Sequence, residues 1–204
     1  MRILVVADIH ETPVRLPKDV DVVFVAGDFT NASSADFAKS FLDSVEVERI
    51  YAIPGNMDTK DVLELLESRG VSIHGKVIDF EGYKLMGFGG SSITPFNTPM
   101  EFDDERIEEE IAGMEADIAV FHDVPNGLFD WIAGKNVGSM AIRRWIESKK
   151  PKLVFCAHIH EYKGVAKLGE TLVVKVPPAS KGEGVLVEFE DPGEPIVQFI
   201  ELEK

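Results

Sequence analysis

The stretch ILVVADIH, residues 3–10, decides how we expect this chain to fold. An apolar, β-branched run ends there in two side chains that can bind a metal ion, Asp8 and His10. Continuous apolarity over about five residues is typical of a strand buried on both faces. No small-residue cleavage site follows the run, so we predict a strand here rather than a signal peptide.

The same pattern, a buried run followed at once by a metal-capable side chain, recurs along the chain. The runs cover residues 3–7, 22–26, 50–53, 118–121 and 153–157. Beyond Asp8 and His10, the side chains that follow these runs are Asp28, Asn56, His122, His158 and His160. Helical patterns lie between several of the runs, which favours an α/β architecture.

The rest of the chain completes this outline. Apolar stripes at helical spacing predict helices near residues 36–42, 62–66, 107–114 and 141–146. Ser33 and Asp36 have capping-box spacing, and Asp58 or Thr59 can cap the second helix. A hairpin is expected over residues 73–80 and 84–88, and strands without helices follow residue 161. Segments 91–100 and 126–136 are predicted to be loops. We therefore expect two sheets with helices outside them.

Composition narrows the classes of function. A length of 204 residues suits one domain over 1–204, and a net charge of −15 disfavours binding to long nucleic acids. No apolar run approaches the roughly 20 residues that a membrane span needs. Cys156 is the only cysteine, so no intrachain disulfide can form, and we expect a cytoplasmic protein.

The positions of the polar side chains predict a metal site. Loops at the carboxyl ends of parallel strands meet at one edge of a sheet, so seven nitrogen and oxygen ligands would converge there. Four of the five histidines stand at these run ends. Taken singly, Asp28 and Asn56 are explained by turn chemistry and each histidine by a satisfied core position. Taken together, the five run ends favour metal binding.

The number and type of these ligands indicate two ions. Seven ligands are too many for one ion, and imidazole with carboxylate suits manganese, iron, zinc or nickel. With one bridging carboxylate they suit two ions about 3.5–4 Å apart. Two divalent cations would make this pocket locally positive within an acidic protein. The pocket could then attract a small phosphorylated substrate without attracting a polyanion.

The ordered motifs DIH (8–10), GD (27–28), GNMD (55–58), HDVP (122–125) and AHIH (157–160) resemble those of the calcineurin-like metallophosphoesterases, in particular the small archaeal and bacterial members. The resemblance covers essentially the whole chain and implies a four-layer αββα sandwich with two mixed sheets. It implies that Asp8, His10 and His160 bind one ion, that Asn56, His122 and His158 bind the other, and that Asp28 bridges them. Manganese is the ion we favour, with iron, nickel, zinc or magnesium as alternatives. A bridging hydroxide would then attack phosphorus, with no protein base required.

The sequence departs from the family pattern in two places. Ala157 replaces a glycine, for which we expect little effect. Met57 replaces a histidine that lies beside the phosphate in the family and is thought to protonate the leaving group. Methionine has no proton to give, so we interpret Met57 as pocket lining. Small members that lack this histidine are often regarded as phosphodiesterases, and we expect a phosphodiester substrate, contacted by Asn56, Met57 and Asp58.

Two other functions are compatible with the fold that we expect. Some proteins of this fold, such as the retromer subunit, have lost catalytic residues and bind protein partners, but this chain keeps all seven ligand positions. A nuclease resembling the double-strand-break repair enzymes is disfavoured by the acidic charge. Phe129 and Trp131 could pack in the core, stack on a nucleoside or form a dimer contact. Homo-oligomerisation therefore stays open, and His74 is expected to flank a strand.

Overall fold

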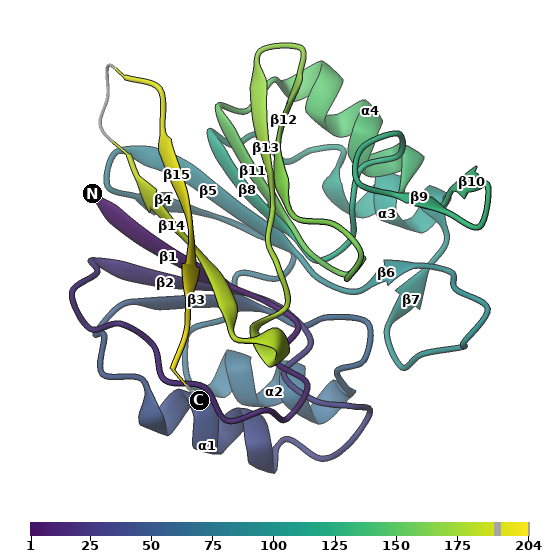
Figure 1. Ribbon diagram of the computed structural model, residues 1–204. Helices are drawn as coiled ribbons and strands as arrows, with labels where there is room; N and C mark the ends of the chain where they lie inside the picture. Colours follow the sequence, from purple (N-terminus) through teal and green to yellow (C-terminus); the bar gives the residue numbers. More distant parts are fainter. Residues whose placement is uncertain (190–192, 204) are drawn as a thin grey trace.

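The computed structural model describes residues 1–189 and 193–203, which form two sheets with helices on both outer faces (Figure 1). The first sheet contains, in chain order, β1 (Arg2–Val6), β2 (Val22–Ala26), β3 (Ile50–Ile53), β14 (Glu183–Glu188) and β15 (Ile196–Glu201). Its spatial order is β15-β14-β1-β2-β3. The pairs β1–β2 and β2–β3 are parallel, whereas β14 runs antiparallel to both β1 and β15.

The second sheet has the order β12-β13-β11-β8-β5-β4. Its strands are β4 (Lys76–Phe80), β5 (Tyr83–Phe88), β8 (Ile118–Phe121), β11 (Leu153–Cys156), β12 (Gly164–Leu168) and β13 (Thr171–Lys175). The four central strands are parallel, and β4 and β12 pair antiparallel at the two edges. Both sheets are therefore mixed, as the family resemblance implies.

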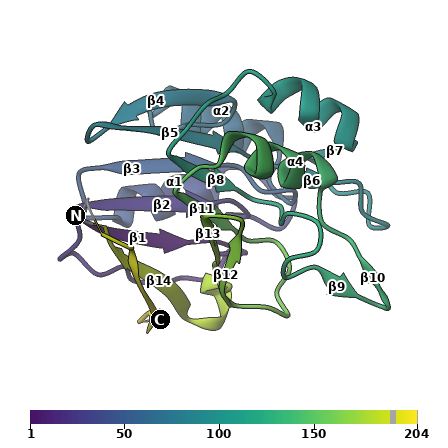
Figure 2. The same cartoon turned by 90° about the horizontal axis from the view of Figure 1, so that it is seen from above.

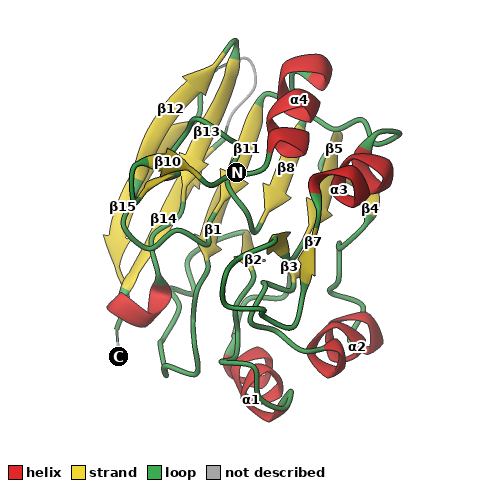
Figure 3. Cartoon of the chain, turned by 90° about the vertical axis from the view of Figure 1, so that its right-hand side faces the viewer, coloured by secondary structure: helices red, strands yellow, loops and turns green. Residues whose placement is uncertain are grey.

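The helices cover the outer faces in pairs. Helices α1 (Asp36–Ser44) and α2 (Lys60–Ser68) pack on the first sheet, and α3 (Asp104–Ile111) and α4 (Met140–Lys149) pack on the second. Figures 1 and 3 show the two pairs on opposite sides of the facing sheets, and in Figure 2, seen from above, α4 lies in front while α1 and α2 lie behind and are drawn fainter. Between the sheets lies an apolar core that joins Phe24 and Ile53 of the first sheet to Leu85 and Phe155 of the second. The expected four-layer αββα sandwich is confirmed.

The alternation of apolar residues explains why each layer is stable. Strand β2 is buried at all five positions, as expected for a strand covered on both faces. In α1 only one stripe is buried, comprising Ala38, Phe41 and Leu42, which is the amphipathic pattern of a surface helix. No helix in the described residues is long and apolar enough to cross a membrane.

Local structure differs from the sequence predictions at three points. The predicted capping box is wrong, because Ala35 occupies the N-cap of α1 without a side-chain bond and the Ser33 hydroxyl donates to Glu11 instead. Thr59 stands at the N-cap of α2 but also makes no capping bond. The predicted loops contain short strands, β6 (Ser91–Ser92) beside β7 (Glu101–Phe102), and a hairpin of β9 (Trp131–Ile132) and β10 (Lys135–Asn136).

Candidate metal centre

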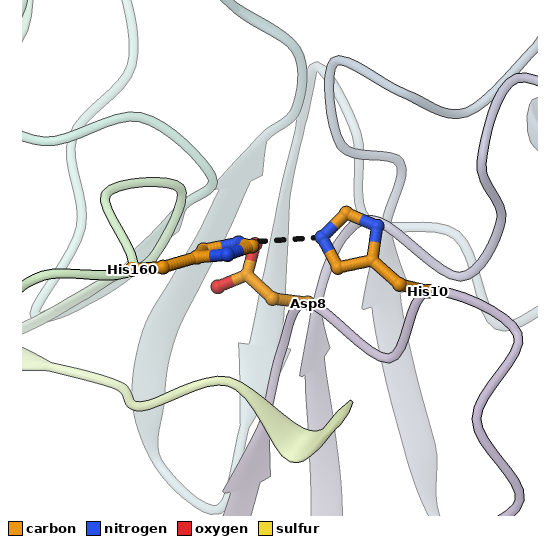
Figure 4. Close-up of side chains that lie close together, drawn as sticks. All are labelled: Asp8, His10 and His160. Carbon is orange, nitrogen blue, oxygen red and sulfur yellow. Dashed lines mark hydrogen bonds and ion pairs between the residues drawn. The ribbon is translucent and has the colours of Figure 1, made fainter. Parts of the chain in front are cut away.

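The carboxyl ends of β1, β2, β3, β8 and β11 bring the polar side chains together from both sheets. Two groups of carboxylates and imidazoles have ligand atoms that all lie within 4.8 Å of one another. One group is Asp8, His10 and His160, and the other is Asp8, Asp28 and His122. Figure 4 shows the first group, in which the rings of His10 and His160 approach each other beside the Asp8 carboxylate. The sequence did not indicate that Asp8 would belong to both groups.

Backbone conformation at these strand ends is unusual. Asp8, His10, Asp28 and His158 all have positive φ, between 47° and 65°. Non-glycine residues rarely adopt this left-handed region, and such strain persists where the surrounding structure enforces it. Here the loops that follow the strands must turn sharply so that their side chains face one point. The strain therefore lies at three members of the two groups, Asp8, His10 and Asp28, and at His158, which belongs to neither group.

Two glycines allow the loops to approach each other. Gly27 has a φ of 92°, and an added Cβ there would lie 2.6 Å from the Cα of Gly55 and 2.7 Å from Nδ1 of His122. At Gly55 an added Cβ would lie 2.0 Å from Oδ1 of Asp28. Any side chain at either position would push the second and third strand-end loops apart. These glycines are therefore needed to place Asp28 next to His122.

The two carboxylate oxygens of Asp28 have different neighbours: one accepts a backbone hydrogen bond, and the other faces two histidines. Its Oδ1 accepts a hydrogen bond from the backbone N–H of Met57 at 2.7 Å. Its Oδ2 lies 3.4 Å from Nε2 of His122 and 3.7 Å from Nε2 of His10. A single oxygen thus faces one histidine of each group, which is the placement that a bridging ligand requires.

The hydrogen bonds of the histidines leave their inner nitrogens with lone pairs. Nδ1 of His122 lies 2.7 Å from the carbonyl oxygen of Ala26, which can only accept, so Nδ1 carries the proton. Nε2 of His122 then faces Oδ1 of Asn56 at 2.9 Å. In the neutral imidazole both of these atoms are acceptors, and a cation or a proton must lie between them.

The same reasoning applies to His10. Asn31 donates through its amide nitrogen to the backbone oxygen of His10, so its Oδ1 accepts from Nδ1 of His10 at 2.9 Å. Nε2 of His10 is left facing Nε2 of His160 at 3.2 Å. Metal-binding histidines commonly donate a hydrogen bond from one ring nitrogen to a protein acceptor, which leaves the other ring nitrogen free to bind the metal.

Asp8 gives a direct test of whether a metal ion fits. Asp8 is fully buried, and among the described residues neither of its carboxylate oxygens accepts a hydrogen bond. Oδ1 lies 3.3 Å from Nε2 of His160 without bonding geometry. A buried carboxylate that accepts no hydrogen bond is costly unless nearby positive charge compensates it. The donor set of carboxylates, imidazoles and an amide therefore fits one or two divalent cations at this point.

The charges shift the ionisation of these groups in the metal-free chain. Burial alone would lower the pKa of His122, but Asp28 and Asp8 raise it to about 9. Burial opposes ionisation of Asp8, yet His160, His122 and Lys175 outweigh that effect and lower its pKa. In both cases the opposite charges of the site outweigh desolvation. His158 packs edge-on against His122 with ring centroids 5.3 Å apart, and burial lowers its pKa.

The residues of the GNMD motif have different surroundings. Asn56 is buried and directs Oδ1 toward His122, whereas Met57 is half-buried. Asp58 is fully buried, and its carboxylate accepts bonds from the backbone N–H groups of Gly55, Phe29 and Thr30. Burial, followed by the charge of Asp28, raises the pKa of Asp58 to about 7. Asp58 holds two loops together, so we do not assign it a contact with substrate.

Sequence reasoning missed several residues around this centre. Asp123 follows His122 directly and accepts two bonds from Ser92, and Thr98 accepts a bond from Asn56. Lys175 is completely buried, and its ammonium donates to the carbonyl of Val176 at 2.8 Å. A single lysine within the apolar run LVVKV was a visible signal. The other contacts depend on which loops become neighbours, which no short motif encodes.

The remaining candidates lie outside the two groups. His74 accepts a hydrogen bond from the backbone N–H of Gly89 beside the hairpin, as its expected position flanking a strand implies. Phe129 is half-buried and packs near Tyr162, while Trp131 is exposed. A cavity of about 700 Å³ lies between residues 13–18 and α1, and none of the seven candidate ligands lines it.

The arrangement defines a metal-binding α/β sandwich, and comparison with known proteins gives its family. The family model of the calcineurin-like phosphoesterases matches residues 1–162, so the chain belongs to this family. An uncharacterised protein of Methanocaldococcus jannaschii is 33% identical over 195 residues, which cover 88% of this chain and 89% of that protein.

Solved structures show the same fold at lower identity. Protein TT1561 of Thermus thermophilus has a TM-score of 0.75 at 18% identity, with 98% of each chain covered. A structure described as a novel archaeal phosphodiesterase has a TM-score of 0.55 at 14% identity, covering 98% of this chain and 100% of that one. Members of this family use divalent metals, and the chain has two groups of candidate metal ligands.

Proposed function

We propose that this protein is a dinuclear metal-dependent phosphodiesterase acting on a small phosphodiester. The observation that carries the proposal is the pair of ligand groups that share Asp8 and face each other across Oδ2 of Asp28. When bound, two divalent ions, manganese being our first choice, would supply Lewis acidity and a water nucleophile that is ionised near neutral pH.

The residues of the chain have distinct roles in this proposal. Asp8, His10 and His160 would hold one ion, and Asn56, His122 and His158 the other, with Asp28 between them. Because Nδ1–H of His122 donates a hydrogen bond to the Ala26 carbonyl, Nε2 is the nitrogen left to bind an ion. Met57, half-buried beside Asn56, would line the substrate pocket.

The preference for diesters rests on the residue at position 57. Methionine cannot protonate a leaving group, so the reaction must rely on a leaving group that departs readily. An archaeal phosphodiesterase with the same fold is consistent with this substrate class. The net charge of −15 favours a small substrate over a nucleic acid. We further propose that residues 1–204 act as one cytoplasmic domain.

A hydrolysis screen tests this function. Bis(p-nitrophenyl) phosphate and p-nitrophenyl phosphate are offered to the metal-free protein with Mn²⁺, Ni²⁺, Mg²⁺ or Zn²⁺ added in turn. We expect hydrolysis that depends on the added metal and is faster for the diester than for the monoester. Absence of hydrolysis with every metal would favour the alternative, a scaffold of the same fold that binds a protein partner.

A further inference from the structure

Residues 91–102 are hydrogen-bonded at two points to the loops that carry candidate metal ligands. At one end, Ser92 donates through its backbone N–H and its hydroxyl to Oδ2 of Asp123, the residue after His122. At the other end, the backbone N–H of Met100 donates to the carbonyl of Asn56 at 3.1 Å. The segment thus spans the two loops that carry Asn56 and His122.

Thr98 connects this segment to the side chain of Asn56. Its Oγ1 accepts a hydrogen bond from Nδ2 of Asn56 at 2.9 Å. The same hydroxyl donates to Oε1 of Glu101 at 2.5 Å. The opposite end of the Asn56 amide, Oδ1, faces Nε2 of His122. A continuous chain of hydrogen bonds therefore runs from Glu101 through Thr98 to the inner face of the centre.

The direction of this chain is set by chemistry. A hydroxyl has one proton and a carboxylate only accepts, so the proton of Thr98 is committed to Glu101. Burial alone would raise the pKa of Glu101, but bonds from Thr94 and Thr98 lower it, which keeps the carboxylate ionised. The Thr98 oxygen can then only accept from Asn56. The amide nitrogen must face Thr98, and the amide oxygen must face the centre.

We propose that Thr98 is a positioning residue that fixes which atom of the Asn56 side chain faces the metal. A metal ion needs the amide oxygen, because the amide nitrogen has no available lone pair. Without the Thr98 hydroxyl, the amide can rotate and present its NH₂ group. This inference rests on the proposed function, since it assigns Asn56 to an ion, and it names a device that the family motifs do not contain.

The test measures Mn²⁺ binding to the metal-free protein, with the free ion followed by electron paramagnetic resonance. In Thr98→Val we expect one of two binding steps to weaken about 10-fold, the lower end of the range for residues that orient metal ligands. Thr98→Ser retains the hydroxyl and should restore binding to near the wild-type level. Thr98→Ala, which cannot overpack the site, repeats the measurement if the valine variant fails to fold.

Thr94→Val is the matched control. Thr94 also donates to Oε1 of Glu101, at 2.5 Å, and lies in the same segment, but its bond does not reach Asn56. We expect this variant to bind Mn²⁺ like the wild type. The proposal is overturned if Thr98→Val binds Mn²⁺ normally, or if Thr94→Val loses as much affinity as Thr98→Val.

Measuring metal binding and hydrolysis separately distinguishes a failure of the Thr98 proposal from a failure of the proposed function. A wild-type protein that binds two Mn²⁺ ions but hydrolyses no phosphoester would contradict the proposed function, and the Thr98 variants would still decide the role of Thr98. A wild-type protein that binds none of Mn²⁺, Ni²⁺, Mg²⁺ and Zn²⁺ would overturn both proposals.

Discussion

The two halves of the candidate metal centre are built differently. We call the set Asn56, His122 and His158 the inner half and the set Asp8, His10 and His160 the outer half. In the inner half, the side chain of His122 is completely buried and is held by the backbone carbonyl of Ala26. In the outer half, the side chains of His10 and His160 are 17% and 37% exposed, and His10 is held by the exposed side chain of Asn31. A backbone carbonyl cannot rotate away, whereas an exposed side chain can. The inner half is therefore the more rigid of the two.

Asp28, whose Oδ2 faces both His122 and His10, is the bridging ligand that we propose, and removing it should have the largest effect. For Asp28→Ala we expect kcat/KM for a phosphodiester to fall by about a thousandfold or more, because Lewis-acid stabilisation amounts to several kcal/mol. Activity assays with saturating Mn²⁺ measure this loss. Asp79→Ala is the control, since Asp79 is an exposed partner of Lys84 at the far hairpin and should leave activity unchanged. An active Asp28→Ala variant would contradict a shared bridging ligand.

Met57 stands in the inner half, beside Asn56, and it offers a second test. In the wild type we expect the rate for aryl phosphodiesters to depend steeply on the pKa of the leaving group. Met57→His should flatten that slope and accelerate poor leaving groups by up to about 10²-fold, the lower end of what general acids contribute. An unchanged slope would count against a missing general acid. Met57→Leu, which also lacks a proton, is the control and should keep the steep slope.

The comparison of the two halves can be tested through metal affinity. We expect His122→Ala to weaken Mn²⁺ binding by about 100-fold or more, because even the loss of a residue that only orients a ligand lowers metal affinity by about 10–100-fold. His10→Ala should weaken it less, because the outer half is more exposed and less rigidly held. Calorimetric titration of the metal-free variants measures both effects. Equal losses would show that burial does not distinguish the halves.

Much of this architecture could be predicted from the sequence, because it depends on local patterns. Buried runs gave the central strands, and the side chain after each run gave the candidate ligands. The capping box at Ser33 failed because Glu11, from another strand-end loop, competes for the hydroxyl. Thr98 and Asp123 were missed for a similar reason. Their bonds join segments more than 30 residues apart, and no spacing rule indicates which loops meet.

The smallest expected effect concerns pH and the metal-free protein. The pKa of His122 is raised from 6.5 to about 9 in the folded chain, so the folded state binds more protons than the unfolded state between these values. The stabilisation is complete below pH 6.5 and is lost as pH rises through about 9. We expect Tm of the metal-free protein to fall by about 5 °C from pH 7 to pH 9.

Two histidine variants and added Mn²⁺ test whether His122 is the source of this pH dependence of Tm. His122→Asn should largely remove it, whereas His10→Asn, in the outer half, should retain it. Added Mn²⁺ should also reduce it, because an ion bound at Nε2 of His122 takes the place of the proton that faces Asp28 and Asn56. Differential scanning calorimetry at several pH values measures all three. If His122→Asn kept the full pH dependence, the assignment of the bound proton to His122 would be wrong.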